Sequence, residues 1–173
     1  KTLLLPVSHA FHSRLMQPML AEFKTIAERI SYKKARCTFI SNIKGESLTQ
    51  VDANYWVEHI RSTVEFQLGI RTLREIGCTM FVEIGPIPTL LGLGSQCVPD
   101  VEEGKPLYWL PSIRPEKEDW EVLLASLGQL YVQGVKVDWQ GFDAPYYRTK
   151  VVLPTYPFQR QRYWARALDQ QRR

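Results

Sequence analysis

Two histidines three residues apart, His9 and His12, are the side chains whose type and spacing best suit proton transfer. They follow an apolar stretch at residues 3–7 and precede a helical pattern, so they fall at a predicted junction between a strand and a helix. An imidazole ordinarily has a pKa near ~6.5, so it can accept and return a proton near neutral pH. Most histidines at such junctions are structural residues, so the spacing alone favours a structural role over catalysis. His59, the third histidine, falls on a predicted helix and suggests no special role.

Other side chains that could act as nucleophiles lack the surroundings that they would need. Ser95 is not followed two residues later by a glycine, and it falls within a predicted helix instead of a strand-to-helix elbow. Ser8 and Ser13 have no such elbow either, and nothing near Cys97 would lower its thiol pKa. No carboxylates are spaced as a catalytic dyad, and no cysteine and histidine spacing predicts a metal site.

The hydrophobic periodicity predicts strands that alternate with helices, and such alternation is typical of a two-sided α/β fold with parallel strands. Helix boundaries are predicted at three residues. Ser13 and Asp52 would cap helix starts, and Gly77 would end a helix. The predicted strands are residues 2–7, 37–41, 79–84, 107–110 and 135–139, and the predicted helices are 13–30, 52–60, 64–76, 88–97 and 116–133. A cluster of Pro, Asp, Glu and Gly at 99–105 predicts a boundary, with domains at 1–100 and 101–173.

Composition indicates a globular protein in a reducing compartment. The chain has 173 residues, 45% of them hydrophobic, and a formal net charge of +4. Three cysteines without metal spacing are best explained as reduced thiols of a cytoplasmic protein. We find no signal peptide and no apolar run of about 18 residues, so no membrane span is expected.

Four segments of the chain resemble segments of one protein family, and they occur in the same order as in that family. His9-Ala10-Phe11-His12-Ser13 resembles the signature of acyltransferase domains in modular polyketide synthases, in the form of the malonyl-selecting subgroup. Residues 82–86 resemble the late strand and turn of that core, and 110–114 resemble the segment that leaves it. Residues 153–164 resemble the linker after the acyltransferase. The resemblance implies the C-terminal portion of an α/β-hydrolase-like acyltransferase core, followed by a linker subdomain and an extended strap.

Two elements of the family's active site have no counterpart here. The family carries its nucleophilic serine in a Gly-His-Ser-x-Gly elbow and grips the substrate carboxylate with an arginine, both upstream of the position of His12. Of the family's small ferredoxin-like subdomain only the final strand, at residues 3–7, is expected. A start at Lys1, within a predicted strand, also suggests a fragment, which we expect to be inactive without the serine-bearing part.

The resemblance assigns roles to four residues. His12 would be the general base for the absent serine, and we expect the helix that begins at Ser13 to disfavour its charged form. A main-chain carbonyl orients this histidine in the family, and Glu65 is the candidate donor of that carbonyl. An exposed helix position is the equally weighted alternative for Glu65. His9 and Phe11 would set substrate selectivity, although Phe11 could instead be a core residue.

Aromatic residues near the C-terminus allow two interpretations. Tyr156, Phe158, Tyr163 and Trp164 alternate with arginines, a pattern that can stack on single-stranded nucleic acid. The same residues can anchor a strap on a neighbouring domain. The resemblance favours the strap, which would run over the linker domain to the ketosynthase.

The implied reaction moves a malonyl group from coenzyme A to the phosphopantetheine thiol of an acyl carrier protein through an acyl-serine intermediate. No metal or prosthetic group is expected. The implied partners are the carrier protein, the upstream acyltransferase half, and the ketosynthase and linker domain of a synthase that is a homodimer. Neither nucleic acid nor a membrane is expected as a partner. One alternative is a stand-alone transacylase, and another is a non-catalytic acyltransferase remnant that serves as a docking platform.

Overall fold

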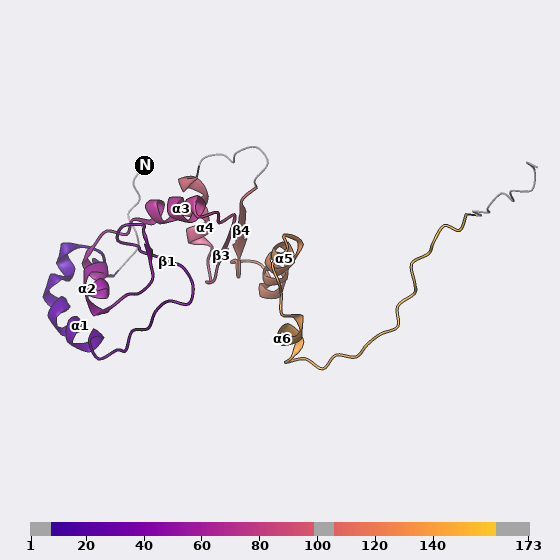
Figure 1. Ribbon diagram of the computed structural model, residues 1–173, viewed down its shortest axis with the longest axis horizontal. Coiled ribbons are helices and arrows are strands. Elements are labelled where there is room, and N and C mark those ends of the chain that lie inside the picture. The colour runs from indigo at the N-terminus through magenta and orange to yellow at the C-terminus, as the bar shows by residue number, and fades with distance from the viewer. Residues whose placement is uncertain (1–7, 99–105, 162–173) are drawn as a thin grey trace, which may run out of the picture. The chain divides into compact units, whose positions relative to one another are not determined.

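The computed structural model describes residues 8–98 and 106–161, so the strand predicted at 2–7 lies outside the described residues. The chain divides into two compact units, Lys1–Val135 and Lys136–Arg173. The elements run in the order η1 (Arg14–Met19), α1 (Leu20–Ala27), β1 (Phe39–Ile40), β2 (Ser47–Leu48), α2 (Ala53–Arg61), α3 (Phe66–Glu75), β3 (Met80–Glu83), α4 (Thr89–Cys97), β4 (Tyr108–Pro111), α5 (Asp119–Val132) and α6 (Trp139–Asp143) (Figure 1).

The first predicted helix is divided into a 3-10 segment and an α-helix. Ser13 caps η1 as predicted, because its Oγ accepts a hydrogen bond from the Leu15 amide at 3.2 Å. Pro18 lies inside η1. Proline has no amide hydrogen and its ring would crowd the carbonyl four residues earlier, so a regular α-helix cannot run through it. The α-helical part therefore begins at Leu20, which is buried.

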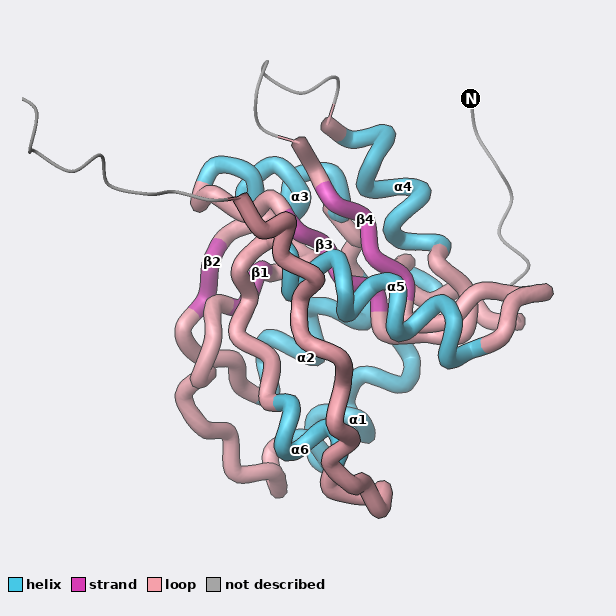
Figure 2. The backbone as a smooth tube through the Cα atoms, turned by 90° about the vertical axis from the view of Figure 1, so that its right-hand side faces the viewer, coloured by secondary structure: helices cyan, strands magenta, loops and turns pink. Residues whose placement is uncertain are grey.

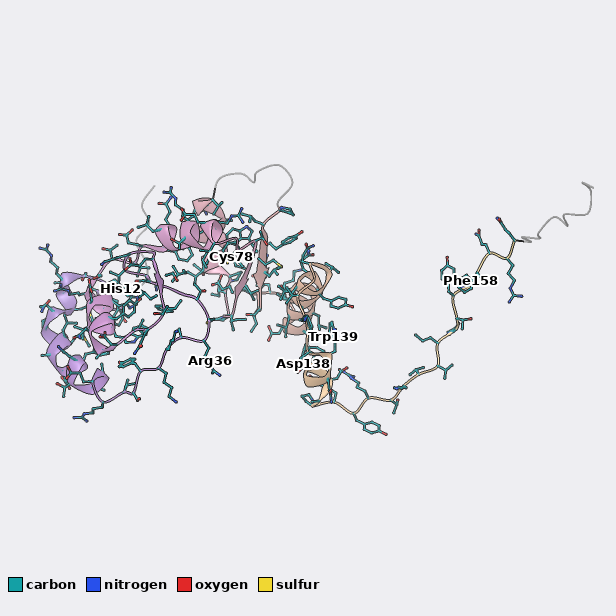
Figure 3. The ribbon with its side chains drawn as sticks, viewed as in Figure 1. His12, Arg36, Cys78, Asp138, Trp139 and Phe158 are labelled. Atoms are coloured by element: carbon teal, nitrogen blue, oxygen red, sulfur yellow. The ribbon has the colours of Figure 1, made fainter. Side chains whose placement is uncertain are left out.

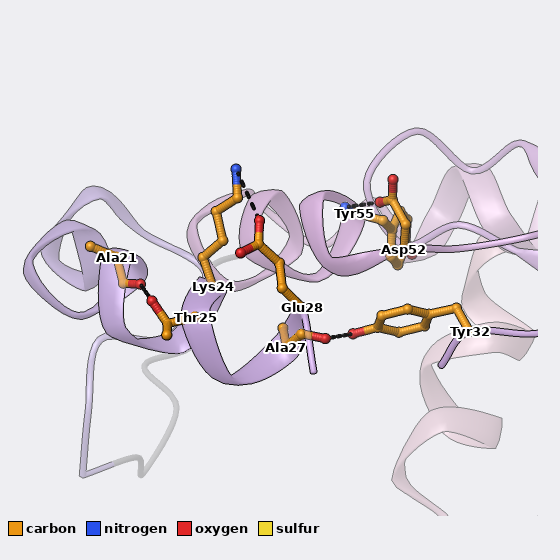
Figure 4. A network of polar contacts seen from close by, with 8 residues as sticks. All are labelled: Ala21, Lys24, Thr25, Ala27, Glu28, Tyr32, Asp52 and Tyr55. Carbon is orange, nitrogen blue, oxygen red and sulfur yellow. Dashed lines mark hydrogen bonds and ion pairs between the residues drawn. The ribbon is translucent and has the colours of Figure 1, made fainter. Parts of the chain in front are cut away.

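Side-chain contacts fix the ends of α1 and α2 (Figure 4). At the end of α1 the Tyr32 hydroxyl donates to the Ala27 carbonyl at 3.1 Å, and Lys24 lies 3.7 Å from Glu28. At the start of α2 the Asp52 carboxylate accepts from the Tyr55 amide at 2.8 Å. The prediction that Asp52 caps this helix is confirmed, because the carboxylate satisfies an amide that has no partner within the helix.

Strands β1 and β2 form an antiparallel hairpin, with Phe39 opposite Leu48 and Ile40 opposite Ser47. The sequence predicts the first strand but treats residues 42–50 as an irregular connection. The turn is closed by the Gly45 amide, which donates to the Ser41 carbonyl at 2.8 Å. Gly45 has a φ of 69°, a left-handed conformation that glycine adopts without strain.

Strands β3 and β4 pair in parallel, in the register Met80–Tyr108 to Glu83–Pro111. Figure 2 shows the two strands side by side, and α4 packs against both. The Phe81 and Trp109 rings stack at 4.4 Å across the pair. The Trp109 ring also packs closely on α4, where a Cβ added at Gly94 would come within 2.7 Å of it.

Strand β3 lies before the predicted boundary at 100/101, and β4 lies after it. Helix α5 also packs on β4, and its Ser126 hydroxyl donates to the Pro111 carbonyl at 2.8 Å. These interactions keep residues 106–135 with the first compact unit, which ends at Val135. The turn-forming residues at 99–105 fall between α4 and β4 in the chain.

The second unit contains α6 and a stretch without helix or strand. The Asp138 carboxylate caps α6 by accepting from the Gly141 amide at 2.8 Å. Arg148 lies 3.2 Å from Asp143 and 4.7 Å from the centre of the Tyr146 ring. Residues 144–161 contain no helix or strand. Across the described ranges, no helix is both long and apolar enough to cross a membrane.

Replacing Gly45 with alanine should destabilise the first unit more than replacing Gly77. Both glycines have a positive φ, 69° and 95°, so alanine costs about 1–2 kcal/mol at either position. At Gly45 the new methyl group would also lie 2.8 Å from backbone of Leu68, whereas at Gly77 nothing lies within 4 Å. We expect a further loss of about 1–3 kcal/mol for Gly45→Ala. Urea unfolding followed by circular dichroism measures both variants, and equal losses would contradict the close approach.

Candidate active site

His12 occupies a backbone conformation that side chains seldom adopt. Its φ is 59°, in the left-handed region where histidine is more frequent than most residues other than glycine. The His12 amide donates to the carbonyl of Ile60 at 2.8 Å, which ties this strained residue to the last turn of α2. Strained residues persist only where surrounding structure holds them, and they concentrate at functional sites.

The His12 ring is held by the same helix (Figure 3). Its Nδ1 lies 2.9 Å from the main-chain carbonyl oxygen of His59. A carbonyl oxygen carries no proton, so Nδ1 must be the donor. When the ring is neutral, the lone pair is therefore on Nε2. This half-buried imidazole is thereby prepared to accept a proton at one defined atom.

Both acceptors are carbonyls that α2 leaves without internal partners. The final helical hydrogen bond runs from the Ser62 amide to the carbonyl of Glu58, so the carbonyls that follow need other donors. They form the negative end of the helix dipole, which favours a positive imidazolium. The sequence predicts instead that the helix start at Ser13 disfavours the positive charge on His12. That start belongs to a six-residue 3-10 helix, whereas the end of α2 bonds to His12 directly.

The predicted orienting residue, Glu65, has other partners. Its carbonyl accepts from the Gly69 amide at 3.1 Å in the first turn of α3, and its amide donates to the Asn42 carbonyl at 2.7 Å. The carbonyl that orients His12 in this structure is that of His59, which differs from the prediction. A sequence signal for His59 was present, because it lies in the last turn of a predicted helix, where carbonyls lack partners.

His59 is itself in an aromatic environment. Its ring meets the His12 ring edge to face at 4.9 Å and stacks on Tyr55 at 5.9 Å. The Asn42 amide nitrogen lies 3.4 Å from its Nε2. Burial, and to a smaller extent the charge of His12, lower the pKa of His59 below its usual value. His59 therefore favours its neutral form beside His12.

The predicted selectivity residues lie together near the start of the described chain. The rings of His9 and Phe11 are 5.5 Å apart, and the Ser8 hydroxyl lies 2.8 Å from His9 Nδ1. Phe11 is 56% exposed, so within the described residues it is not a core side chain.

The aromatic strap residues belong to the second unit as far as they are described. Tyr156 and Phe158 meet edge to face at 4.9 Å, and about three quarters of each side chain is exposed. Tyr163 and Trp164 lie outside the described residues.

The discounted nucleophiles are engaged in local hydrogen bonds. The Ser95 hydroxyl donates to the Gly92 carbonyl at 3.0 Å, and the Cys97 thiol lies 3.2 Å from the Leu93 carbonyl oxygen. Among residues 8–98 and 106–161, no three His, Cys, Asp or Glu side chains are grouped so that they could hold a metal ion.

Comparison with known proteins identifies the family. The family model of the acyl transferase domain matches residues 2–137. The chain is 40% identical to the polyketide synthase GfsA of Streptomyces halstedii over 166 residues. This match covers 95% of this chain and 2% of GfsA. The chain therefore belongs to the acyl transferase domain family.

Solved structures define the fold more closely. The acyltransferase domain from the second module of the salinomycin polyketide synthase matches with a TM-score of 0.77 and 42% identity, over 89% of this chain and 36% of that one. Malonyl CoA-acyl carrier protein transacylase from Clostridium perfringens matches with a TM-score of 0.61 and 25% identity, over 76% of this chain and 40% of that one. The fold is that of a polyketide synthase acyltransferase domain, which confirms the predicted resemblance and α/β class. The chain spans little more than a third of the salinomycin domain's length.

His59 should make the stability of the first unit depend on pH. Its pKa is lowered in the folded protein, while in the unfolded chain it titrates near ~6.5. As pH falls through ~6.5 the unfolded state takes up this proton first, so the free energy of unfolding decreases; above that pH His59 has no effect.

The measurement is urea unfolding at several pH values between about 7.5 and 5.5 for the wild type and His59→Phe. The phenylalanine keeps an aromatic ring and the main-chain carbonyl but does not titrate. We expect a smaller loss of stability on acidification in the variant. Identical losses in the two proteins would show that His59 is not responsible.

Proposed function

We propose that this chain is the C-terminal part of a polyketide synthase acyltransferase that transfers a malonyl group from coenzyme A to the phosphopantetheine thiol of an acyl carrier protein. The observation that carries the proposal is the 2.9 Å contact between His12 Nδ1 and the His59 carbonyl, which leaves the lone pair of the neutral ring on Nε2. Membership of the acyl transferase family supplies the reaction class.

In this proposal the nucleophile is a serine supplied by residues outside the present sequence. The sequence contains no Gly-His-Ser-x-Gly elbow, and the chain spans 36% of the similar salinomycin acyltransferase. His12 Nε2 accepts the hydroxyl proton as the serine oxygen attacks the thioester carbonyl. The carbon–sulfur bond then breaks, and the imidazolium returns the proton to the coenzyme A thiolate.

The second half of the reaction uses the same atoms in reverse. His12 Nε2 takes the proton of the phosphopantetheine thiol, whose sulfur attacks the acyl-serine carbonyl. The ester bond breaks and the proton returns to the serine oxygen. Throughout, the His59 carbonyl accepts from Nδ1–H and stabilises the transient imidazolium, as an orienting group must.

Phe11 and His9 would set the extender unit. Their rings lie 5.5 Å apart, and the bulk of Phe11 would occupy the space needed by an α-methyl branch. One methyl group changes binding in a pocket by only about 1–3 kcal/mol, so this selectivity would be partial.

The exposed aromatic residues of the second unit would contact other parts of the synthase. Tyr156 and Phe158 expose large apolar rings, and such residues often anchor protein interfaces. We propose the linker domain and ketosynthase of the same homodimeric synthase as their partners, with Tyr163 and Trp164 continuing the strap.

Replacing His12 with alanine should reduce acyl loading of the intact synthase by about 10²–10⁴-fold, because proton transfer to and from the thioester loses its base. Mass spectrometry of the protein mixed with malonyl-CoA measures the acyl adduct over time. Ser95→Ala is the matched control and should load at the wild-type rate, since this exposed hydroxyl only bonds to its own helix. Absence of an adduct on the wild type would instead favour a docking platform.

Replacing Phe11 with serine should raise the use of methylmalonyl-CoA relative to malonyl-CoA by roughly 5- to 100-fold, because the smaller side chain admits the branch. The two thioesters are offered together and their adducts are separated by mass. Unchanged relative rates would remove Phe11 from the selectivity site.

A further inference from the structure

The His59 side chain contacts the candidate base but has no role in the reaction as proposed so far. Its main-chain carbonyl binds His12, yet its ring also meets the His12 ring edge to face, at 4.9 Å and an interplanar angle of 77°. On its other sides the ring stacks on Tyr55 at 5.9 Å and meets Trp56 edge to face at 5.7 Å. The imidazole of His59 is therefore held between α2 aromatic residues and His12.

The contact with Asn42, with its amide nitrogen toward the ring, suits a neutral His59. An amide nitrogen can only donate, so His59 Nε2, 3.4 Å from Asn42 Nδ2, must be the acceptor. A doubly protonated imidazole has no acceptor, and two donors would then face each other. In the neutral ring the proton is consequently on Nδ1.

The backbone of Asn42 is fixed from the other side. The Glu65 amide donates to the Asn42 carbonyl at 2.7 Å, next to the start of α3. Residues from the hairpin turn, α2 and the start of α3 thus form one chain of contacts that ends on the His12 ring.

Charged side chains occur on α2 and on the two elements packed against it. The elements packed against α2 carry Arg14, Glu22 and Lys24, and α2 itself carries Glu58 and Arg61. The charge that acts on His59 is that of His12, and together with burial, the larger cause, it lowers the pKa of His59. A neutral neighbour leaves His12 free to become an imidazolium without a second positive charge 4.9 Å away.

We propose that the His59 side chain is a positioning residue for His12: its ring, kept neutral by Asn42, fixes the plane of the His12 imidazole so that Nε2 points to the reacting serine. The inference rests on the proposed acyltransferase function. It adds a second histidine to the site, acting through the first and not on the substrate.

The test uses His59→Ala and His59→Phe in the intact synthase, with loading from malonyl-CoA as the readout. The alanine variant removes the ring but keeps the carbonyl, and we expect kcat to fall about tenfold with KM unchanged, because one face of His12 loses its support. The phenylalanine variant restores the ring edge and should return kcat to within about threefold of the wild type. Val57→Ala is the matched control, since it removes apolar packing from α2 on the groove that faces α1, and it should load normally.

The pH profile distinguishes positioning from a general structural effect. A ring that stays neutral contributes no charge, so His59→Phe should keep the acid limb of kcat against pH at its wild-type midpoint. His59→Arg places a fixed positive charge beside His12, opposes its protonation, and should move that limb to lower pH. Wild-type kcat in His59→Ala, an equal loss in Val57→Ala, or a shifted limb in His59→Phe would each overturn the inference.

A measurement on the protein without substrate separates this inference from the proposed function. Imidazole ¹⁵N spectra report which nitrogen of His12 carries the proton. We expect Nδ1–H in the wild type and a mixture of tautomers in His59→Ala, because a His12 ring that has lost its edge contact can turn away from the main-chain carbonyl that the variant keeps. A single unchanged tautomer in the variant would overturn the positioning role even if the enzyme loads malonyl groups. Conversely, loading that survives His12→Ala would disprove the proposed base while leaving the tautomer result intact.

Discussion

The contact between the end of α2 and His12 is the interaction on which the candidate site depends. Two successive carbonyls, of His59 and Ile60, accept hydrogen bonds from the ring and the amide of the same histidine, at 2.9 and 2.8 Å. The bond from the His12 amide fixes its left-handed backbone, and the bond from the ring fixes its tautomer. Neither carbonyl has a partner within its own helix, so each bond satisfies a backbone group that would otherwise need water. The hydrogen bonds that stabilise this part of the fold are therefore the same ones that orient the candidate base.

The remaining elements of the first unit can be understood as supports for that helix end. Asp52 starts α2 by binding the Tyr55 amide, and Ser62 ends it by binding the Glu58 carbonyl, so the position of its last turn is set at both ends. The hairpin places Asn42 against His59, and the Glu65 amide holds Asn42 from the start of α3. Local caps thus determine a geometry that joins residues far apart in the chain.

Local signals in the sequence were sufficient for helices such as α2 and α3, because Asp52 and Gly77 act within a few residues of themselves. They did not predict α6, which begins at Trp139 in a stretch predicted to be extended. His12 is predicted as the base through a motif of its family. The sequence could not identify which carbonyl reaches Nδ1, because that depends on how α2 packs against η1. The pairing of β3 with β4 is a long-range contact that the turn-forming residues between them do not reveal either.

The pairing of β3 with β4 also bears on how the chain acquires its structure during synthesis. The hairpin of β1 and β2 closes over a short turn, so it can form as soon as its residues leave the ribosome. Strand β3 can pair with β4 only after Tyr108–Pro111 has been made. Helix α4, which follows β3 directly and packs on it, can cover part of that strand during the delay. The order of elements along the chain thereby limits the exposure of β3 before β4 is made.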